Sequence, residues 1–576
     1  MERPFLSIGL FFLLLSHPAP FLLAQESDTG KGKVPGVRQK YVDYFSKDKE
    51  QKRSEGTYLD GNEHGKWRYW YENGRLKEVA NYFMGNFHGK VVHYYKDGQK
   101  KDKGFFYLDT QDSSFKSWYP NGRLEQKGAY DSGRKVGKWT YWYENGQKMK
   151  VEEHGARKDT NFRVMAYWTE EGEQTLKEGN GFIEYYYGPD SLEERIHYKN
   201  GLRHGKYEAW YPGGAKRVEG FYDEGNMDST WTRSYFTGTT KKVRNFRDGT
   251  LQGKLVRYFG NGNVNVKGQY ENGKKEGEWK WYYRDGNKDF KGTFVNGKQH
   301  GHWKYWYPNG QLYYEGRLDS GVRVGTWTFY YEGGSKWKEG TFKDGKKEGK
   351  WTWWFENGQK LQEGKFEKGK EEGLWVSWFE NGQKKDKGRF RNARMHGEWT
   401  GWYPNGQKRY HGKRKKGIKV GEWTHWYSNG EMEEKGGYKN GEKHGEWTAW
   451  NKHGIKTHQG EYDEGLKDGT WIFYHKTGVK IREQEFEQGH LDGTSKTWYP
   501  NGNLKSKMEY ETFSLDESKA GKDKGRDAVK VQLDGDCVYY DEKGNVTRKV
   551  EYEKGKIVEQ EDTGKKGKGG KGSYRP

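Results

Sequence analysis

The chain has 576 residues and a formal net charge of +21, with 104 Lys and Arg against 83 Asp and Glu. Only 31% of the residues are hydrophobic and the mean hydropathy is −1.31, which excludes a thick aliphatic core and is typical of disordered chains. Aromatic residues nevertheless make up 17% of the sequence, and their regular spacing favours an ordered repeat protein.

Residues 1–24 have the features of a secretory signal peptide. Arg3 provides a positive charge before an apolar run, and Ala24 is a small residue before a cleavage point. Two prolines interrupt the stretch, which argues against a stable membrane span. We expect cleavage after Ala24 and export to the periplasm, the cell surface or the medium, with uncleaved anchoring as the alternative. Residues 25–40 are expected to be a flexible lead-in.

Residues 41–510 consist of a 24-residue repeat that begins with glycine. With that glycine as position 0, the unit reads G-x-W-x-x-W-Y-x-N-G-Q, then G-x-Y or G-x-F from position 15, and a second glycine at position 20. A fixed period of this length indicates a repeat architecture. The register is irregular over residues 156–180, where we expect a bulge or a kink.

Each repeat is predicted to form one β-hairpin. Asn-Gly at positions 8 and 9 lies between aromatic-rich runs and is a strong signal for a two-residue type I′ turn. The second glycine would then close a longer loop to the next repeat. The predicted fold class is all-β, an elongated single-layer solenoid of about 19 hairpin repeats with capping hairpins.

The predicted turn also predicts the two faces of the sheet. It pairs position 5 with 12, position 4 with 13 and position 2 with 15, so that positions 2, 4, 6, 11, 13, 15 and 17 share the core face. Position 2 is tryptophan in twelve repeats. Glycine at position 15 would leave room for the indole directly opposite it in the same hairpin.

The C-terminal part departs from the repeat. Residues 511–528 are predicted to be a charged spacer, 529–558 a capping hairpin and 559–576 a basic disordered tail. Cys537 stands where the repeat would have tryptophan. It is the only cysteine of the chain, so no intrachain disulfide can form.

The repeat resembles the MORN variant of the YwqK-type antitoxin repeat family, and the likeness extends over about residues 41–555. The resemblance implies a row of β-hairpins and a role in binding or scaffolding. Original MORN repeats are richer in glycine and are linked with membranes, and this chain departs from their pattern. Its positive charge makes an acidic membrane surface one candidate partner. The Trp-Tyr pairs are also similar to choline- and glucan-binding repeats, although those units are shorter.

No pattern in the sequence indicates an enzyme. Six histidines precede a leading glycine, but equivalent residues of adjacent hairpins lie about 10 Å apart, too far to share one zinc ion. These are His64, His88, His204, His300, His396 and His444. No nucleophile triad, zinc-protease motif or phosphate loop is present. We therefore expect no catalysis, no cofactor and no metal.

An aromatic stripe at position 5 is the candidate binding site. Position 5 lies on the face opposite the core and is mostly tryptophan, among charged and polar neighbours. The rings either cover the stems of neighbouring lysines and glutamates or bind a glycan or a partner protein. The stripe residues singled out are Trp306, Trp354, Trp378, Trp402, Trp426 and Trp450.

The sequence thus predicts a non-catalytic exported protein that acts as an extended binding surface or envelope scaffold. The expected partner is a protein or a cell-envelope glycan or polyanion, whereas export makes nucleic acid a poor candidate. The alternative is an antitoxin-like inhibitor of a partner toxin, retained inside the cell.

Overall fold

A computed structural model describes residues 36–155, 162–514 and 529–563. Every regular element within these ranges is a β-strand, and none is a helix. The predicted all-β class is therefore confirmed. The signal peptide and most of the lead-in, spacer and tail lie outside the described residues.

The described residues contain 44 strands, which belong to one antiparallel sheet. The first fifteen strands are β1 (Arg38–Tyr44), β2 (Lys52–Leu59), β3 (Asn62–Trp70), β4 (Leu76–Phe83), β5 (Asn86–Tyr94), β6 (Lys100–Tyr107), β7 (Thr110–Trp118), β8 (Leu124–Asp131), β9 (Arg134–Trp142), β10 (Lys148–His154), β11 (Phe162–Trp168), β12 (Gln174–Lys177), β13 (Asn180–Gly188), β14 (Ser191–Lys199) and β15 (Leu202–Trp210).

The array then continues with strands of eight or nine residues up to β39. They are β16 (Lys216–Asp223), β17 (Asn226–Ser234), β18 (Thr240–Arg247), β19 (Thr250–Tyr258), β20 (Val264–Glu271), β21 (Lys274–Tyr282), β22 (Lys288–Val295), β23 (Lys298–Trp306), β24 (Leu312–Asp319), β25 (Val322–Tyr330), β26 (Lys336–Lys343), β27 (Lys346–Trp354), β28 (Lys360–Glu367), β29 (Lys370–Trp378), β30 (Lys384–Arg391), β31 (Arg394–Trp402), β32 (Lys408–Lys415), β33 (Ile418–Trp426), β34 (Met432–Lys439), β35 (Glu442–Trp450), β36 (Lys456–Asp463), β37 (Leu466–Tyr474), β38 (Lys480–Glu487), β39 (His490–Trp498) and the longer β40 (Leu504–Ser514). Four strands follow residue 528: β41 (Val529–Leu533), β42 (Gly535–Tyr540), β43 (Val546–Glu553) and β44 (Lys556–Asp562).

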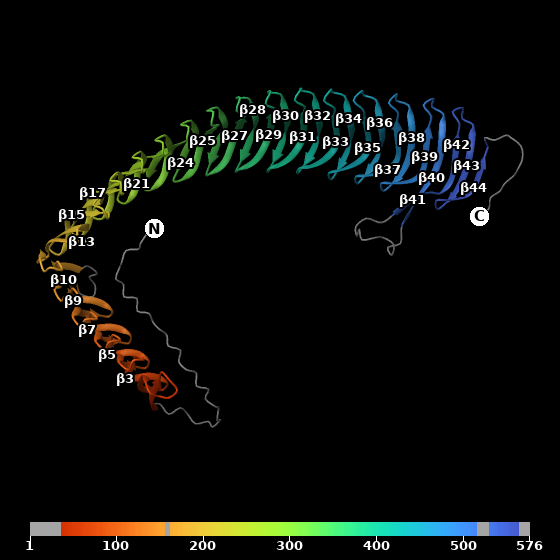
Figure 1. Cartoon of the computed structure of the whole chain (residues 1–576). Helices are drawn as coiled ribbons and strands as arrows, with labels where there is room; N and C mark the ends of the chain where they lie inside the picture. The colour runs from red at the N-terminus through yellow and green to blue at the C-terminus, as the bar shows by residue number, and fades with distance from the viewer. Residues whose placement is uncertain (1–35, 156–161, 515–528, 564–576) are drawn as a thin grey trace. The chain divides into compact units, whose positions relative to one another are not determined.

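The chain divides into two compact units, residues 1–184 with 195–205, and residues 185–194 with 206–576. Within the second unit each strand pairs with its sequence neighbours, as β24 does with β23 and β25. Figure 1 shows these hairpins side by side, for example from β27 to β37. The predicted one-hairpin repeat is confirmed.

The Asn-Gly turn differs from the prediction. The amide of Tyr307 donates to the carbonyl of Gln311 at 2.8 Å, and the amide of Gly310 donates to the carbonyl of Tyr307 at 2.9 Å. Gly310 has a φ of +88°, whereas Asn309 has no positive φ. This is a three-residue loop whose glycine forms a bulge. The predicted two-residue type I′ turn is wrong at this place.

The two-residue turn lies instead at positions 19 and 20. Asp319 pairs directly with Val322, and the two residues between them, Ser320 and Gly321, have φ values of +50° and +88°. Positive φ at both central residues is the requirement of a type I′ turn. The prediction of a longer loop here is therefore wrong. The two-residue turn lies where the longer loop was predicted, and the longer loop lies where the two-residue turn was predicted.

The three-residue loop changes the register by one residue. Tyr305 pairs with Tyr314 as predicted, but Trp306 pairs with Leu312, so position 5 faces position 11. The largest core cluster draws its buried residues only from positions 2, 4, 13 and 17. Assigning positions 6 and 11 to the core face was therefore wrong, because the bulge separates them from it.

The core glycine receives its tryptophan from the next repeat. Gly316 is the register partner of Trp303, as predicted, but a Cβ on Gly316 would lie 2.2 Å from Trp327. The indole of Trp327 also donates to the carbonyl of Arg317 at 3.1 Å. The prediction that the glycine accommodates the indole of its own hairpin is wrong. The glycine couples adjacent repeats.

The turns of adjacent repeats are joined by side chains. The hydroxyl of Tyr331 at position 6 donates to the carbonyl of Trp354 in the following repeat at 2.8 Å. Similarly, the Asn309 side-chain amide donates to the carbonyl of Glu332 at 3.2 Å, while its oxygen accepts from the Gln311 amide. The aromatic side chain at position 6 therefore joins adjacent turns and does not pack in the core.

Two segments depart from the regular array. Around the irregular stretch, β10 to β12 are short and the core is mostly aliphatic, with Val164, Leu176 and Ile183 buried beside Tyr167. At the C-terminal end, β40 pairs with both β41 and β42, and β44 continues to Asp562 against β43. The last strand thus extends into the segment predicted as a disordered tail, because its backbone completes the pairing of β43.

Candidate functional site

The position-5 stripe lies on the face opposite the core, as predicted. Its six tryptophans, Trp306, Trp354, Trp378, Trp402, Trp426 and Trp450, are all half-buried. Because the bulge shifts the register by one residue, each ring lies on the same face of the sheet as the position-11 side chain of its own hairpin. Whether the stripe binds a ligand stays a prediction.

A lysine at position 11 of the preceding repeat lies over most of these rings. Lys336 Nζ is 5.7 Å from the centroid of Trp354, and the same lysine contacts Glu339 at 2.9 Å. Equivalent contacts occur at 5.6 Å for Lys288 on Trp306, 5.5 Å for Lys360 on Trp378 and 5.7 Å for Lys408 on Trp426. Each of these repeats therefore presents one ring beside one ammonium group, a pairing that the sequence analysis missed because it placed position 11 on the core face.

A second row of cations covers six of the core tryptophans of the second unit, on the other face. Each of these lysines or arginines comes four residues before its tryptophan, with its charge 3.9 to 4.8 Å from the ring centroid. Burial lowers the pKa of Lys275, Lys347, Lys419 and Lys467. The pairs in the second unit are Lys275–Trp279, Arg323–Trp327, Lys347–Trp351, Lys419–Trp423, Lys443–Trp447 and Lys467–Trp471.

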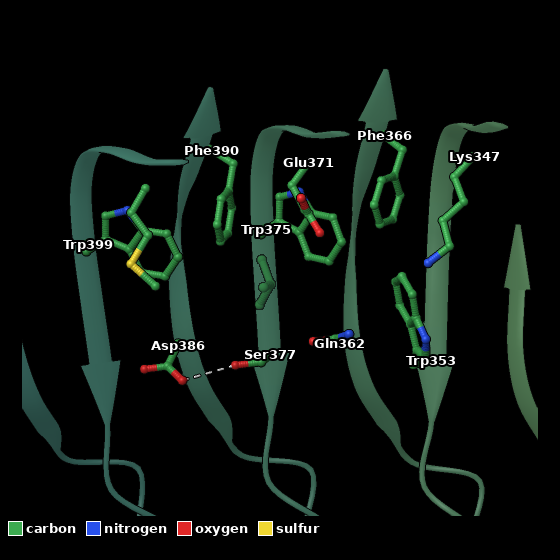
Figure 2. A pocket seen from close by; sticks show the side chains of 12 residues that line it. Lys347, Trp353, Gln362, Phe366, Glu371, Trp375, Ser377, Asp386, Phe390 and Trp399 are labelled. Carbon is green, nitrogen blue, oxygen red and sulfur yellow. Dashed lines mark hydrogen bonds between the residues drawn. The ribbon is translucent and has the colours of Figure 1, made fainter. Parts of the chain in front are cut away.

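A pocket of about 380 Å³ lies on this core face between β27 and β31. Figure 2 shows that aromatic rings line it, among them Trp353, Trp375 and Trp399, with Ser377 and Asp386 at its base. Ser377 and Asp386 occupy positions 4 and 13, where the repeats at residues 277–324 have aromatic rings. The sequence analysis missed this pocket, although the change of residue type at these two positions is visible in the sequence.

The polar groups of the pocket are held in place. Ser377 Oγ donates to one oxygen of Asp386 at 3.3 Å, and Tyr410 donates to the other at 2.6 Å. Burial raises the pKa of the Tyr410 hydroxyl, and its hydrogen bond to Asp386 adds to the rise. Tyr410 therefore stays protonated and remains a donor to the carboxylate.

The histidines before the leading glycines are not assembled into a site. His300 and His444 lie near Asp319 and Asp463, at 3.3 Å and 3.0 Å. Among the described residues, no group of three or more His, Cys, Asp or Glu side chains is placed to hold a metal ion. No helix in the described ranges has the length and apolarity needed to span a membrane.

Comparisons with known proteins identify the repeat. Ten segments match the family described as MORN repeat variant: residues 63–83, 135–153, 275–296, 299–318, 323–344, 347–368, 371–392, 395–416, 419–440 and 491–512. The predicted MORN-variant resemblance is confirmed, while the narrower likeness to YwqK-type antitoxins stays a prediction. A comparison with curated proteins gives no match.

Several solved structures share only weak similarity with the chain. A structure titled TcdB2-TccC3 has 10% identity and a TM-score of 0.12, covering 90% of this chain and 36% of its own. The match to the Photorhabdus luminescens Tc holotoxin pore has 10% identity and a TM-score of 0.12, and it covers 91% of this chain and 35% of the other chain. The chain spans about a third of the length of these chains. Scores this low support no functional argument.

Proposed function

We propose that the protein is a non-catalytic, exported scaffold that binds an extended anionic polymer, such as an acidic cell-envelope glycan, along the position-5 stripe. The observation that carries this proposal is the recurring pair of a half-buried tryptophan and a lysine over its ring, as in Trp354 and Lys336. The net charge of +21 favours an anionic partner.

The pair offers two kinds of contact to such a polymer. The exposed part of the ring can stack on the apolar face of a sugar, and the ammonium group can pair with a carboxylate or phosphate. The side chains of Lys336 and Lys360 are 49% and 47% exposed. Their ammonium groups pair with Glu339 and Glu363 at 2.9 Å and 2.8 Å, so an anionic group of the polymer would compete with these carboxylates. Adjacent pairs lie about 10 Å apart, because each repeat contributes two strands. A polymer with a regular spacing of charges could therefore contact several repeats at once.

The test compares two triple variants that remove the same charge. Lys336, Lys360 and Lys408 are changed to Gln in the first, and the exposed lysines Lys343, Lys415 and Lys439, which lie at position 18, are changed to Gln in the second. We expect the full-length protein to bind a teichoic acid or an acidic polysaccharide in a sedimentation assay. The first variant should bind at least tenfold more weakly, and the second should stay near the wild type.

A variant with Trp354, Trp378, Trp402 and Trp426 changed to Ala tests the rings directly. It should keep the circular dichroism of the wild type and lose binding. Equal loss of binding in both lysine variants would contradict the proposal, since it would show attraction by net charge alone. Absence of binding by the wild type to every acidic polymer tested would also contradict it.

A further inference from the structure

The row of cations over the core tryptophans has a gap at the pocket. Glu371 and Met395 stand four residues before Trp375 and Trp399, at the places where Lys347 and Lys419 stand in the flanking repeats. Among the described residues, no lysine or arginine lies over the ring of Trp375 or Trp399. Two consecutive repeats therefore lack the ammonium or guanidinium group that covers the indole in the repeats on either side.

The rings at this gap are more exposed than those of the flanking repeats, although a missing cation alone does not expose an indole, since Gln299 stands four residues before Trp303, which is 0% exposed. Trp375 and Trp399 are 9% and 6% exposed, whereas Trp351 and Trp423 in the flanking repeats are 1% exposed. Phe390 is only half-buried, while its equivalent Phe366 is 3% exposed. Figure 2 shows Glu371 beside the ring of Trp375, with Phe366 and Phe390 on either side of that ring.

The charges of the pocket favour a cation. Glu371 and Asp386 contribute two carboxylates, and Lys347 contributes one ammonium group beside Trp353, close enough for the charge of Glu371 to act on the Lys347 pKa. Among the described residues, no lysine or arginine forms an ion pair with Glu371 or Asp386. The faces of the surrounding rings carry partial negative charge, which attracts a cation within about 6 Å.

A comparison within the chain shows why Glu371 leaves a cavity. Glu63 stands at the same place before Trp67, but there position 4 is Tyr69, whose hydroxyl donates to Glu63 at 2.6 Å. Trp67 is 1% exposed. In the pocket, position 4 is Ser377, which is too short to reach Glu371 and donates to Asp386 instead. The space that a tyrosine ring fills in one repeat is thus open in the other.

We propose that this pocket binds an alkylammonium group supplied by a ligand, which takes the place that a lysine of the chain takes in the flanking repeats. The ammonium group would lie over Trp375 and Trp399 and pair with Glu371 and Asp386, while its alkyl part would contact Phe366 and Phe390. A lysine side chain of a partner polypeptide and a free quaternary amine present the same chemistry. The site lies on the face opposite the position-5 stripe and does not depend on the function proposed above.

The test uses matched charged and neutral probes in calorimetric titrations of the full-length protein. Choline is compared with its uncharged isostere 3,3-dimethylbutan-1-ol, and Nα-acetyl-lysine methylamide is compared with its Nε-acetylated form. We expect each charged probe to bind at least tenfold more tightly than its neutral counterpart. Binding of both charged probes would show that the cationic group is sufficient. Binding of the lysine derivative alone would identify a lysine side chain as the ligand.

The decisive variant is Glu371→Lys, which restores the row of cations found in the flanking repeats. It should fold as well as the wild type and lose at least tenfold in affinity, because its own ammonium group fills the pocket. Met395→Lys provides a second variant of the same design if the first fails to fold. Met227→Lys, before Trp231, is the control outside the pocket and should bind like the wild type. Equal affinity for charged and neutral probes, or full binding by both pocket variants, would overturn the proposal.

Discussion

Gly316 lies against the indole of Trp327, eleven residues further along the chain, and a Cβ on Gly316 would lie 2.2 Å from the ring. Each of the twelve tryptophans at position 2 has a glycine at this spacing before it. Where the glycine is absent near the C-terminal end, the tryptophan is absent too. Gln484 stands eleven residues before Ser495, and Met508 precedes Cys537 across the spacer. A large residue at position 15 therefore accompanies a small residue at position 2 of the next repeat.

Gly316→Ala should destabilise the repeats on both sides of it. Overpacking a filled core costs about 1–3 kcal/mol, and neither backbone nor ring can move easily here. Gly260→Ala is the control, because a Cβ at Gly260 meets nothing within 4 Å. Hydrogen exchange measured by mass spectrometry should show faster exchange of the strands around Trp327 only in the first variant. Unchanged exchange in Gly316→Ala would contradict the packing described.

Ser495→Trp should destabilise the chain alone and be rescued by Gln484→Gly. The single change places an indole against Gln484, whose amide now donates to the Ser495 hydroxyl at 3.4 Å. The double variant recreates the glycine–tryptophan pair of the regular repeats. We expect a favourable coupling of more than about 1 kcal/mol in a double-mutant cycle measured by urea unfolding. Additive effects of the two changes would show that position 15 does not accommodate the next indole.

Ser320→Asn should stabilise the second turn. Ser320 has a φ of +50°, a conformation that asparagine adopts more readily than serine. We expect a gain of about 0.5 kcal/mol, seen as a higher midpoint of thermal unfolding. Ser428→Asn is the matched control, because Ser428 lies in the first turn and has no positive φ. An equal gain in both variants would exclude the type I′ turn as its cause.

His93 should titrate well above the usual range of histidine. Burial lowers its pKa, but the hydrogen bonds and charges of Asp102 and Glu78, at 2.5 Å and 3.4 Å, outweigh burial and raise the pKa to about 9. Because the folded pKa is raised, the stabilisation is present in full below pH 6.5 and is lost as the pH rises through 9. It amounts to at most about 3 kcal/mol.

Nuclear magnetic resonance of the labelled imidazoles checks the His93 prediction, with His93→Gln used to identify its signal. The first unit should also become more sensitive to limited proteolysis between about pH 7 and about pH 9.5 in the wild type, and His93→Gln should remove that dependence. A His93 pKa at the usual value of about 6.5 would contradict the two carboxylate contacts.

The sequence predicts the repeat, the hairpin and most of the core, since period and alternation follow directly from residue type. It does not distinguish the two turns. Asn-Gly suits both a type I′ turn and a three-residue loop with a bulge, because each requires positive φ at the glycine. The two-residue turn has Asn or Asp before its glycine in several repeats, as at Asn272, Asn296 and Asp344, and Ser, Lys or Gln in others. The same dipeptide signal therefore occurs at both turns.

The stripe and the pocket differ in how far the sequence reveals them. Position 5 is recognisable by its recurring tryptophans, but its lysine partner depends on the one-residue shift that the bulge introduces. The pocket depends on Glu371, Ser377 and Asp386 acting together. Their departure from the pattern is visible in the sequence, yet only the packing shows that no neighbouring side chain fills the space that they leave.

The pairing of each glycine with the tryptophan of the following repeat gives the array a direction and makes its length adjustable. Removing residues 325–348 would bring Gly316 to a position eleven residues before Trp351, so the junction would again contain a fitting pair. A chain of this design can gain or lose whole 24-residue units without acquiring a new type of contact. Insertion of any other number of residues would instead separate one glycine from its tryptophan, and the indole would then have no glycine to pack against.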